Sequence, residues 1–283
     1  MNNMDKKTYQ EKNLPKKAAQ IRRDIADIVY RSSAGHIGGS LSETDILVAL
    51  YYEVMKTDPK NPQWPGRDRF ILSKGHAIDA YYCVLADKGF FDKEELKNYS
   101  QFGSDLIGHP NRAIPGIEMN TGALGHGLSI GVGMALAAKM DKKDYRVFVL
   151  MGDGEQAEGS VWEAAMAAAN YKLDNLVAII DRNGLQISGT TEDVMALSPL
   201  KDKWKSFGWN VSVVDGHDIP SICNALSKKN KVDSMPSLII AETIKGKGIS
   251  FMENNASWHH GVMSEDEYKI ACEELDKMLE VLS

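Results

Sequence analysis

The chain has 283 residues, of which 43% are hydrophobic and 25% charged, and its formal net charge is −6. This length and composition correspond to one large globular domain or two small ones and exclude general disorder. The acidic balance argues against a nucleic-acid partner, which requires a basic surface, and no apolar run reaches the roughly 18 residues of a membrane span.

Residues 1–17 are polar and lysine-rich, so we expect a short solvated lead-in rather than a secretory signal. The three cysteines, Cys83, Cys223 and Cys272, are odd in number and far apart. This pattern indicates neither a disulfide framework nor a cysteine zinc site. We therefore expect a protein of the reducing cytoplasm.

Apolar spacing predicts a helix over Ala18–Ser32. A second helix is predicted over Glu43–Met55, with Ser42 as its N-cap and Asp45 in its first turn. The segment 57–67 holds three prolines and is expected to be a loop.

Short, nearly continuous apolar runs then alternate with helical patterns. The predicted strands are Phe70–Leu72, Val147–Met151, Leu176–Ile180, Val211–Val214 and Leu238–Ala241. The predicted helices are Leu128–Met140, Ser160–Tyr171, Leu200–Phe207, Ile219–Lys228 and Ser264–Leu282. Such alternation is typical of a parallel sheet with helices on both faces, so we expect one three-layer α/β domain over residues 18–283. The helices Leu128–Met140 and Ser160–Asn170 are rich in small residues, which suits either tight packing within the domain or an interface between chains.

Six of the seven histidines have a glycine neighbour, and only His259 lacks one. The six are His36, His76, His109, His126, His217 and His260. Glycine favours turns, so most of these imidazoles are expected on loops, and their spacing fits no common metal motif. We expect some of them to hydrogen-bond a polar, uncharged substrate or to exchange protons with it.

A glycine-rich turn, Gly152–Gly159, links the strand at Val147–Met151 to a helix and predicts an anion site. A dinucleotide-binding fingerprint is rejected because Asp153 lies between the glycines, where it would repel a diphosphate. A divalent cation bridging the two would remove this conflict.

A second ligand is expected at the end of the next strand, where Asn183 follows Asp153 by 30 positions. In a parallel sheet both strand ends reach the same edge. A carboxylate, an amide oxygen and a nearby backbone carbonyl are hard oxygen donors, which favour Mg²⁺ or Ca²⁺ over zinc.

Gly152–Gly154 followed by Asn183 resembles the thiamine diphosphate motif of thiamine-dependent enzymes, and further loops narrow the resemblance to the transketolase family. These loops are Ser33–Gly38, Ser73–Ala77, Gly108–Pro110, Thr121–Gly127, Lys245–Gly248 and His260–Gly261. They occur in the family's order over nearly the whole chain.

The resemblance implies a thiamine-diphosphate-binding fold and a role for each matching residue. Asp153, Asn183 and the carbonyl of Leu185 would bind Mg²⁺, which Ca²⁺ or Mn²⁺ could replace. The cofactor contacts would be His76, Gly122, Ala123, Leu124, Gly154, Glu155, Asn183 and His260. The catalytic set would be His36, His76, His109, His260 and Glu158, with His36, His109 and His260 on the donor's hydroxyls and Glu158 linking two active sites across an interface. His126 and His217 are expected to be structural, and the role of His259 stays open.

Two departures from the family matter: Ile37 stands where a proline is usual, and the chain ends just after the diphosphate-binding domain. The resemblance therefore implies the N-terminal half of a split transketolase, which moves a two-carbon ketol unit between sugar phosphates. It would need a separate C-terminal subunit with the pyrimidine-binding domain, and a two-plus-two heterotetramer is expected.

Other interpretations remain. The chain could belong to the decarboxylase component of a 2-oxo acid dehydrogenase, although several Gly-His loops suit a polyhydroxylated sugar better. Deoxyxylulose phosphate synthase is related but is normally a single chain. A third interpretation is a non-catalytic scaffold, although such a protein would not need Asp153 and Asn183, which are both present. For a transketolase, pentose phosphates are the default donors, with a sulfonated or branched sugar phosphate also open.

Overall fold

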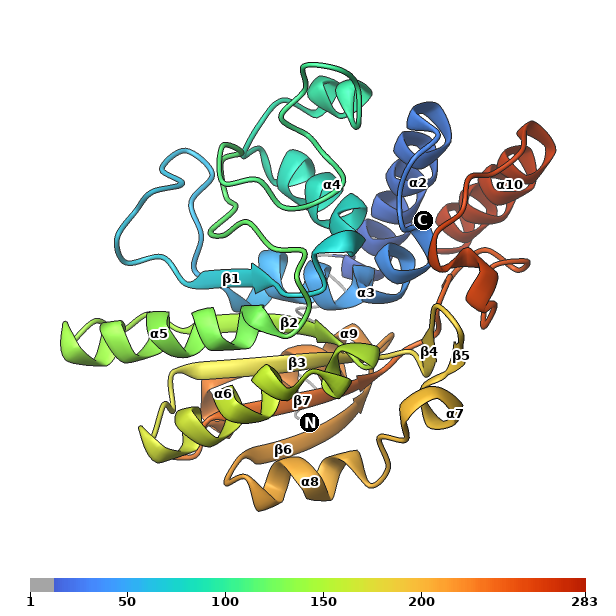
Figure 1. Cartoon of the computed structure of the whole chain (residues 1–283). Coiled ribbons are helices and arrows are strands. Elements are labelled where there is room, and N and C mark those ends of the chain that lie inside the picture. The colour runs from blue at the N-terminus through green and yellow to red at the C-terminus, as the bar shows by residue number, and fades with distance from the viewer. Residues whose placement is uncertain (1–12) are drawn as a thin grey trace.

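A five-stranded parallel sheet forms the centre of the protein, in the order β1-β2-β3-β7-β6 (Figure 1). The computed structural model describes residues 13–283. The strands are β1 Arg69–Leu72, β2 Val147–Gly152, β3 Leu176–Arg182, β6 Asn210–Asp215 and β7 Ser237–Glu242. A small antiparallel pair, β4 Leu185–Gln186 and β5 Gly189–Thr190, lies apart from this sheet.

Helices cover both faces of the sheet, as expected. The α-helices are α2 Leu14–Ser32, α3 Ile37–Ala49, α4 Ile78–Lys88, α5 His126–Met140, α6 Gly159–Asn170, α7 Thr191–Met195, α8 Leu200–Ser206, α9 Ile219–Ala225 and α10 Glu265–Val281. A π-helical turn, Leu50–Val54, extends α3, and 3₁₀ turns lie at Gly75–Ala77, Lys93–Asn98, Gly154–Ala157, Lys228–Asn230 and Ala256–His259. The α/β three-layer architecture predicted from the sequence is confirmed.

Alternate residues of each strand enter two separate cores. In β2, Phe148 and Leu150 pack with α2, α3, α4, α9 and α10, whereas Val147 and Val149 pack with α5, α6 and α8. Both sets are fully buried. Burial on both faces explains why the strands are continuously apolar in sequence.

The first two helices begin earlier than the sequence predicted. Helix α2 begins at Leu14 with Asn13 as its N-cap, so the expected lead-in over residues 1–17 ends before Leu14, and residues 1–12 lie outside the described part. Helix α3 begins at Ile37, so the prediction of Ser42 as an N-cap is wrong. The polar residues that suggested a boundary there are instead buried in the helix and paired, since Ser42 donates to Asp181 and Asp45 binds Arg22.

The register of the central strands brings the two predicted ligand loops together. Gly152 at the end of β2 is paired with Asp181 at the end of β3. The following residues, Asp153 and Asn183, therefore leave the same edge of the sheet, as the sequence predicted. Across the described residues, no helix has both the length and the hydropathy needed to cross a membrane.

The close packing of α5 on the sheet can be tested with two glycines of that helix. A Cβ on Gly131 would lie 2.5 Å from Val149 Cγ2, whereas a Cβ on Gly133 would meet nothing within 4 Å. Gly131→Ala is expected to destabilise the fold by about 1–3 kcal/mol through overpacking. The matched control Gly133→Ala is expected to stabilise it by up to about 1 kcal/mol. Urea unfolding measures both, and equal effects would contradict this packing.

Candidate active site

A cavity of about 420 Å³ opens beyond the carboxyl ends of β1, β2, β3 and β7. Most of the residues predicted from the sequence line it, namely His36, His76, Gly122, Leu124, Asp153, Gly154, Glu155, Asn183 and Leu185. The others, Ala123, His109, Glu158 and His260, are exposed and do not line the cavity itself. The carboxyl edge of a parallel sheet is where α/β proteins bind ligands.

Asp153 and Asn183 lie at the centre of the edge. Asp153 Oδ1 accepts from the Gly154 N–H at 2.8 Å, and its Oδ2 accepts from the Gly184 N–H at 2.6 Å. Burial, followed by the charge of Asp181, raises the pKa of Asp153 to about 6. A buried carboxylate in this setting would gain from a bound cation.

The donor set at this edge fits a hard cation. Asn183 Oδ1 accepts from the Leu185 N–H at 3.1 Å. The intervening Gly184 N–H donates to Asp153, so the amide oxygen and the Asp153 carboxylate lie on adjoining loops. No group of three or more His, Cys, Asp or Glu residues that could hold a metal occurs among residues 13–283. The available donors are therefore one carboxylate, one amide and backbone carbonyls, which favour Mg²⁺ or Ca²⁺ and leave room for ligand oxygens.

Glu155 is committed to holding loops together. Its carboxylate accepts from the Gly125 N–H at 2.7 Å and the Gly152 N–H at 3.0 Å, and also from the Ser73 hydroxyl. These bonds join the loops after β1 and β2 to the start of α5. Both carboxylate oxygens of Glu155 are thus occupied by bonds within the protein. The cofactor contact expected of Glu155 would have to involve its other atoms.

Five histidines form a cluster centred on His36. Its ring centroid lies 4.7 Å from that of His260 and 5.1 Å from that of His76. The corresponding distances to His259 and His109 are 5.7 Å and 6.5 Å. His259, left open by the sequence, thus faces the cavity, and its buried Nδ1 has no hydrogen-bond partner among the described residues.

Burial lowers the pKa of three of these imidazoles, those of His36, His76 and His259, and so favours their neutral form. Burial, followed by neighbouring charge on His260, lowers the pKa of His36 to about 4. Burial together with Lys245 lowers the pKa of His259 to about 3. A neutral imidazole offers one donor and one acceptor, which matches the hydrogen-bonding needs of a hydroxyl group.

Two buried lysines, Lys74 and Lys245, line the same cavity. Neither was among the site residues predicted from the sequence. Lys74 Nζ lies 2.6 Å from Asp181 and 2.9 Å from Glu43, so its charge is balanced. Lys245 is 2% exposed, and its ammonium has no hydrogen bond or ion pair within residues 13–283. Burial, followed by the charge of Lys74, lowers the pKa of Lys245 to about 8. Among the described residues Lys245 thus forms no direct ion pair, and only the more distant carboxylates of Asp181 and Asp153 offset its charge, a feature that the motif Lys245–Gly248 alone could not reveal.

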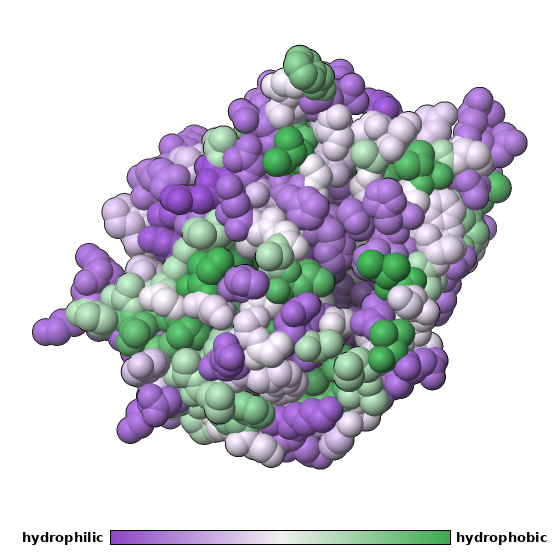
Figure 2. All heavy atoms as spheres, viewed as in Figure 1, coloured by the Kyte–Doolittle hydropathy of each residue, from purple (hydrophilic) through white to green (hydrophobic). Residues whose placement is uncertain are grey.

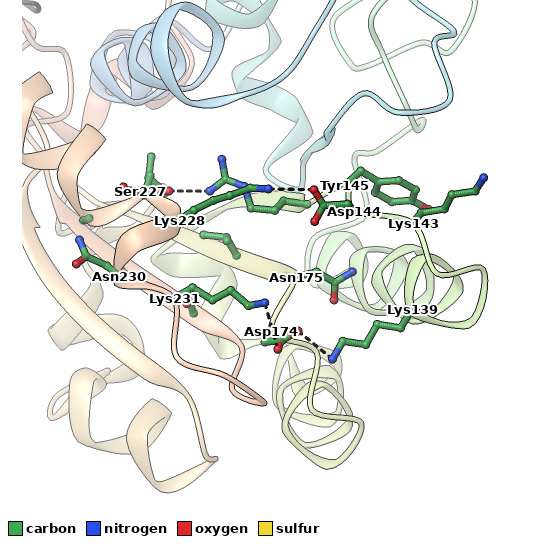
Figure 3. A pocket seen from close by; sticks show the side chains of 15 residues that line it. Lys139, Lys143, Asp144, Tyr145, Asp174, Asn175, Ser227, Lys228, Asn230 and Lys231 are labelled. Carbon is green, nitrogen blue, oxygen red and sulfur yellow. Dashed lines mark hydrogen bonds and ion pairs between the residues drawn. The ribbon is translucent and has the colours of Figure 1, made fainter.

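A second cavity, of about 350 Å³, lies at the opposite edge of the sheet (Figure 3). Three of its four lysines are already paired, since Lys139 and Lys231 contact Asp174 at 2.9 and 3.3 Å and Lys228 contacts Asp144 at 3.4 Å. This cavity lacks the combination of an unpaired buried cation and clustered imidazoles, so the first cavity is the better candidate site.

Comparison with known proteins agrees with this geometry. Residues 15–277 match the family described as transketolase, thiamine diphosphate binding domain. The chain therefore belongs to the transketolase family and carries its thiamine-diphosphate-binding domain.

Several relatives are similar along their whole length. The chain is 51% identical over 273 residues to a subunit of the apulose-4-phosphate transketolase of Phocaeicola vulgatus, covering 96% of this chain and 97% of the relative. It is 44% identical over 269 residues to the 6-deoxy-6-sulfo-D-fructose transketolase subunit SqwG of Clostridium sp., covering 95% and 98%. The transketolase structure from Campylobacter jejuni superposes with a TM-score of 0.87 at 34% identity, covering 98% of this chain and 43% of that one.

The two buried lysines should differ in their effect on stability. Lys74→Met leaves Asp181 and Glu43 without their counter-charge, so we expect a loss of about 3 kcal/mol in the free energy of unfolding. The matched control, Lys245→Met, removes an unpaired buried charge and should be neutral or stabilising at pH 7. Any gain should fade between pH 8 and 10.5, as wild-type Lys245 loses its proton more readily in the folded state.

Denaturant unfolding of both variants across this pH range measures the difference. Equal destabilisation at pH 7 would show that the Lys245 ammonium stabilises the fold as much as the paired Lys74 does.

Proposed function

We propose that this chain is the diphosphate-binding half of a two-subunit transketolase that transfers a two-carbon ketol unit from a ketose phosphate to an aldose phosphate. The observation that carries the proposal is the meeting of Asp153, Asn183 and the unpaired Lys245 in one cavity. A cation bound by the first two residues and the lysine ammonium together would offset the charge of a diphosphate.

Most of the predicted site residues have a role in this proposal. Asp153, Asn183 and the carbonyl of Leu185 would hold Mg²⁺, while Gly122, Leu124 and Gly154 would line the cofactor. A Cβ on Gly154 would lie 2.7 Å from Gln186 Oε1 and 3.2 Å from Gln186 Cβ, so the glycine lets Gln186 pack closely on this turn. When bound, thiamine diphosphate supplies the stabilised carbanion that carbon–carbon transfer requires.

The imidazole cluster would bind the sugar. His36, His109 and His260 would exchange hydrogen bonds with the donor's hydroxyls, and His76 would lie beside the cofactor. A Cβ on Gly122 would lie 2.9 Å from His109 Cδ2, so the glycine allows this imidazole to approach the cofactor loop. A set of imidazoles that can each donate and accept hydrogen bonds suits a polyhydroxylated donor better than a 2-oxo acid.

A partner chain is supported by the relatives' names and by the surface. The similar chains of matching length are named as transketolase subunits. Figure 2 shows apolar side chains gathered over α5 and α6, where Met140 and Met166 are 75% and 55% exposed. We propose that a second copy and a pyrimidine-binding partner chain cover this face in a cytoplasmic heterotetramer, with the exposed Glu158 reaching across the interface.

The names of the relatives also bear on the donor. Two relatives, at 51% and 47% identity, are named for apulose-4-phosphate, and one at 44% for 6-deoxy-6-sulfo-D-fructose. We therefore propose a branched ketose phosphate of the apulose-4-phosphate type as the donor. The sulfonated ketose and ordinary pentose phosphates are the competing donors in the same transfer assay.

The metal assignment is tested by Asp153→Ala in the two-subunit complex. Loss of the carboxylate should abolish Mg²⁺-dependent binding of thiamine diphosphate in calorimetry, because the cation loses its only charged protein ligand. Asp144→Ala, in the other cavity, is the matched control and should bind as the wild type does. Normal affinity in the Asp153→Ala complex would disprove the assignment.

The donor role of His109 is tested by His109→Ala. Loss of one hydrogen bond to the donor should lower kcat/KM about tenfold or more while cofactor affinity stays within about twofold. Lys245→Met should instead lower the affinity for the cofactor, because the lost ammonium is expected to contact the diphosphate. If His109→Ala weakens cofactor binding and turnover equally, His109 contacts the cofactor instead.

A further inference from the structure

His217 lies outside the cavity, in the turn that follows β6. Its Nδ1 is 2.7 Å from Asp45 Oδ2 in α3, and its Nε2 is 2.9 Å from the backbone nitrogen of Ile244, just beyond β7. One imidazole thus joins three segments that are far apart in the sequence. The sequence had suggested only a structural role at a helix start.

The two bonds determine how the ring is protonated. The Ile244 N–H can only donate, so His217 Nε2 must present its lone pair. The ring proton is then on Nδ1, which donates to the Asp45 carboxylate. Arg22 fixes that carboxylate with two guanidinium contacts at 2.5 and 3.3 Å, and both residues are at least 95% buried.

Ile244 needs this acceptor because strand β7 ends at Glu242. Its N–H lies beyond the sheet ladder and would otherwise be without a partner among the described residues. The next residue is Lys245, whose side chain lines the cavity. The bond to His217 therefore fixes the backbone immediately before the buried ammonium.

Backbone hydrogen bonds hold the loop beside His217, among them those from the Thr243 N–H to Arg182 O at 3.1 Å and from the Asn254 N–H to Lys245 O at 3.0 Å. Gly246 N–H donates to Gly38 O at 3.0 Å on the far side of Lys245, and Gly216 N–H donates to Glu242 O at 2.7 Å. These bonds hold the strand ends and the residue after Lys245. Burial of an ammonium without a direct ion pair is unfavourable, so the Lys245 side chain would tend to turn toward solvent. A backbone fixed on both sides of Lys245 opposes this movement.

We propose that His217 is a positioning residue for the anion site: it anchors the loop at Ile244 so that Lys245 stays directed into the cavity before the ligand arrives. This inference rests on the proposed function, in which Lys245 receives a diphosphate. If the ammonium is already in place, ligand binding does not pay the entropic cost of ordering the loop, and the affinity for the ligand is higher.

Two substitutions separate the two hydrogen bonds of the imidazole. His217→Gln can place an amide oxygen near the position of Nε2, where it accepts from the Ile244 N–H. His217→Asn can place an amide nitrogen near the position of Nδ1, where it donates to Asp45, but it has no atom that reaches Ile244. The asparagine variant thus removes the anchoring bond, and the glutamine variant is its matched control.

The first readout is hydrogen exchange of the amides at residues 243–247 in the full chain, which requires no cofactor. Exchange should be about tenfold faster in His217→Asn and close to the wild-type rate in His217→Gln. The second readout is calorimetric affinity for thiamine diphosphate with Mg²⁺ in the two-subunit complex. Affinity should fall about fivefold to tenfold in the asparagine variant alone.

A double-mutant cycle distinguishes positioning from general destabilisation. Adding His217→Asn to Lys245→Met should cause no further loss of affinity, because the lysine that the loop positions is already gone. Additive losses, or equal behaviour of the asparagine and glutamine variants, would overturn the proposal. If the wild-type complex binds no thiamine diphosphate, the proposed function fails, while amide exchange still decides whether His217 anchors the loop.

Discussion

The carboxylate of Asp181 is the point at which the loops around the cavity meet. It accepts from Lys74 Nζ at 2.6 Å and from the Ser42 hydroxyl at 2.6 Å, as well as from the Thr243 hydroxyl. The Asn183 amide lies 3.3 Å away. These donors come from α3 and from the ends of β1, β3 and β7, so one buried carboxylate ties together the elements that shape the site.

This arrangement separates two kinds of buried charge. Lys74 lines the cavity but is neutralised by Asp181 and Glu43, and breaking these pairs would leave buried carboxylates without a counter-charge. Lys245 and Asp153 lack such strong pairing and lie where a ligand can reach them. The protein thus uses its own counter-charges in the framework and leaves one cation and one carboxylate without strong pairing at the cavity.

The sequence predicted the strands well, and it placed Asp153 and Asn183 at the same edge of the sheet, because apolar runs and the ends of strands can be recognised along the chain. Continuous apolar runs identify strands buried on both faces, and strand ends in a parallel sheet converge on one edge. It failed at Ser42, because a polar residue that finds its partners within a buried helix resembles a cap when only the sequence is considered.

The roles of Lys74, Lys245 and His217 were not predictable in the same way. Each depends on a partner, or on the lack of one, that lies more than 25 positions away in the chain. His259 was left open for the same reason, since only the folded structure places its ring 5.1 Å from that of His76. Spacing along a sequence cannot report such long-range pairing.

The central claim is that this chain supplies half of a ketol-transfer site and is completed by another chain. The most direct measurement is the transfer of a two-carbon unit with thiamine diphosphate and Mg²⁺, assayed for this chain alone, for the proposed pyrimidine-binding partner chain alone and for the mixture. We predict transfer only in the mixture. Transfer by this chain alone, or none by the mixture with any of the three donor classes, would contradict the account.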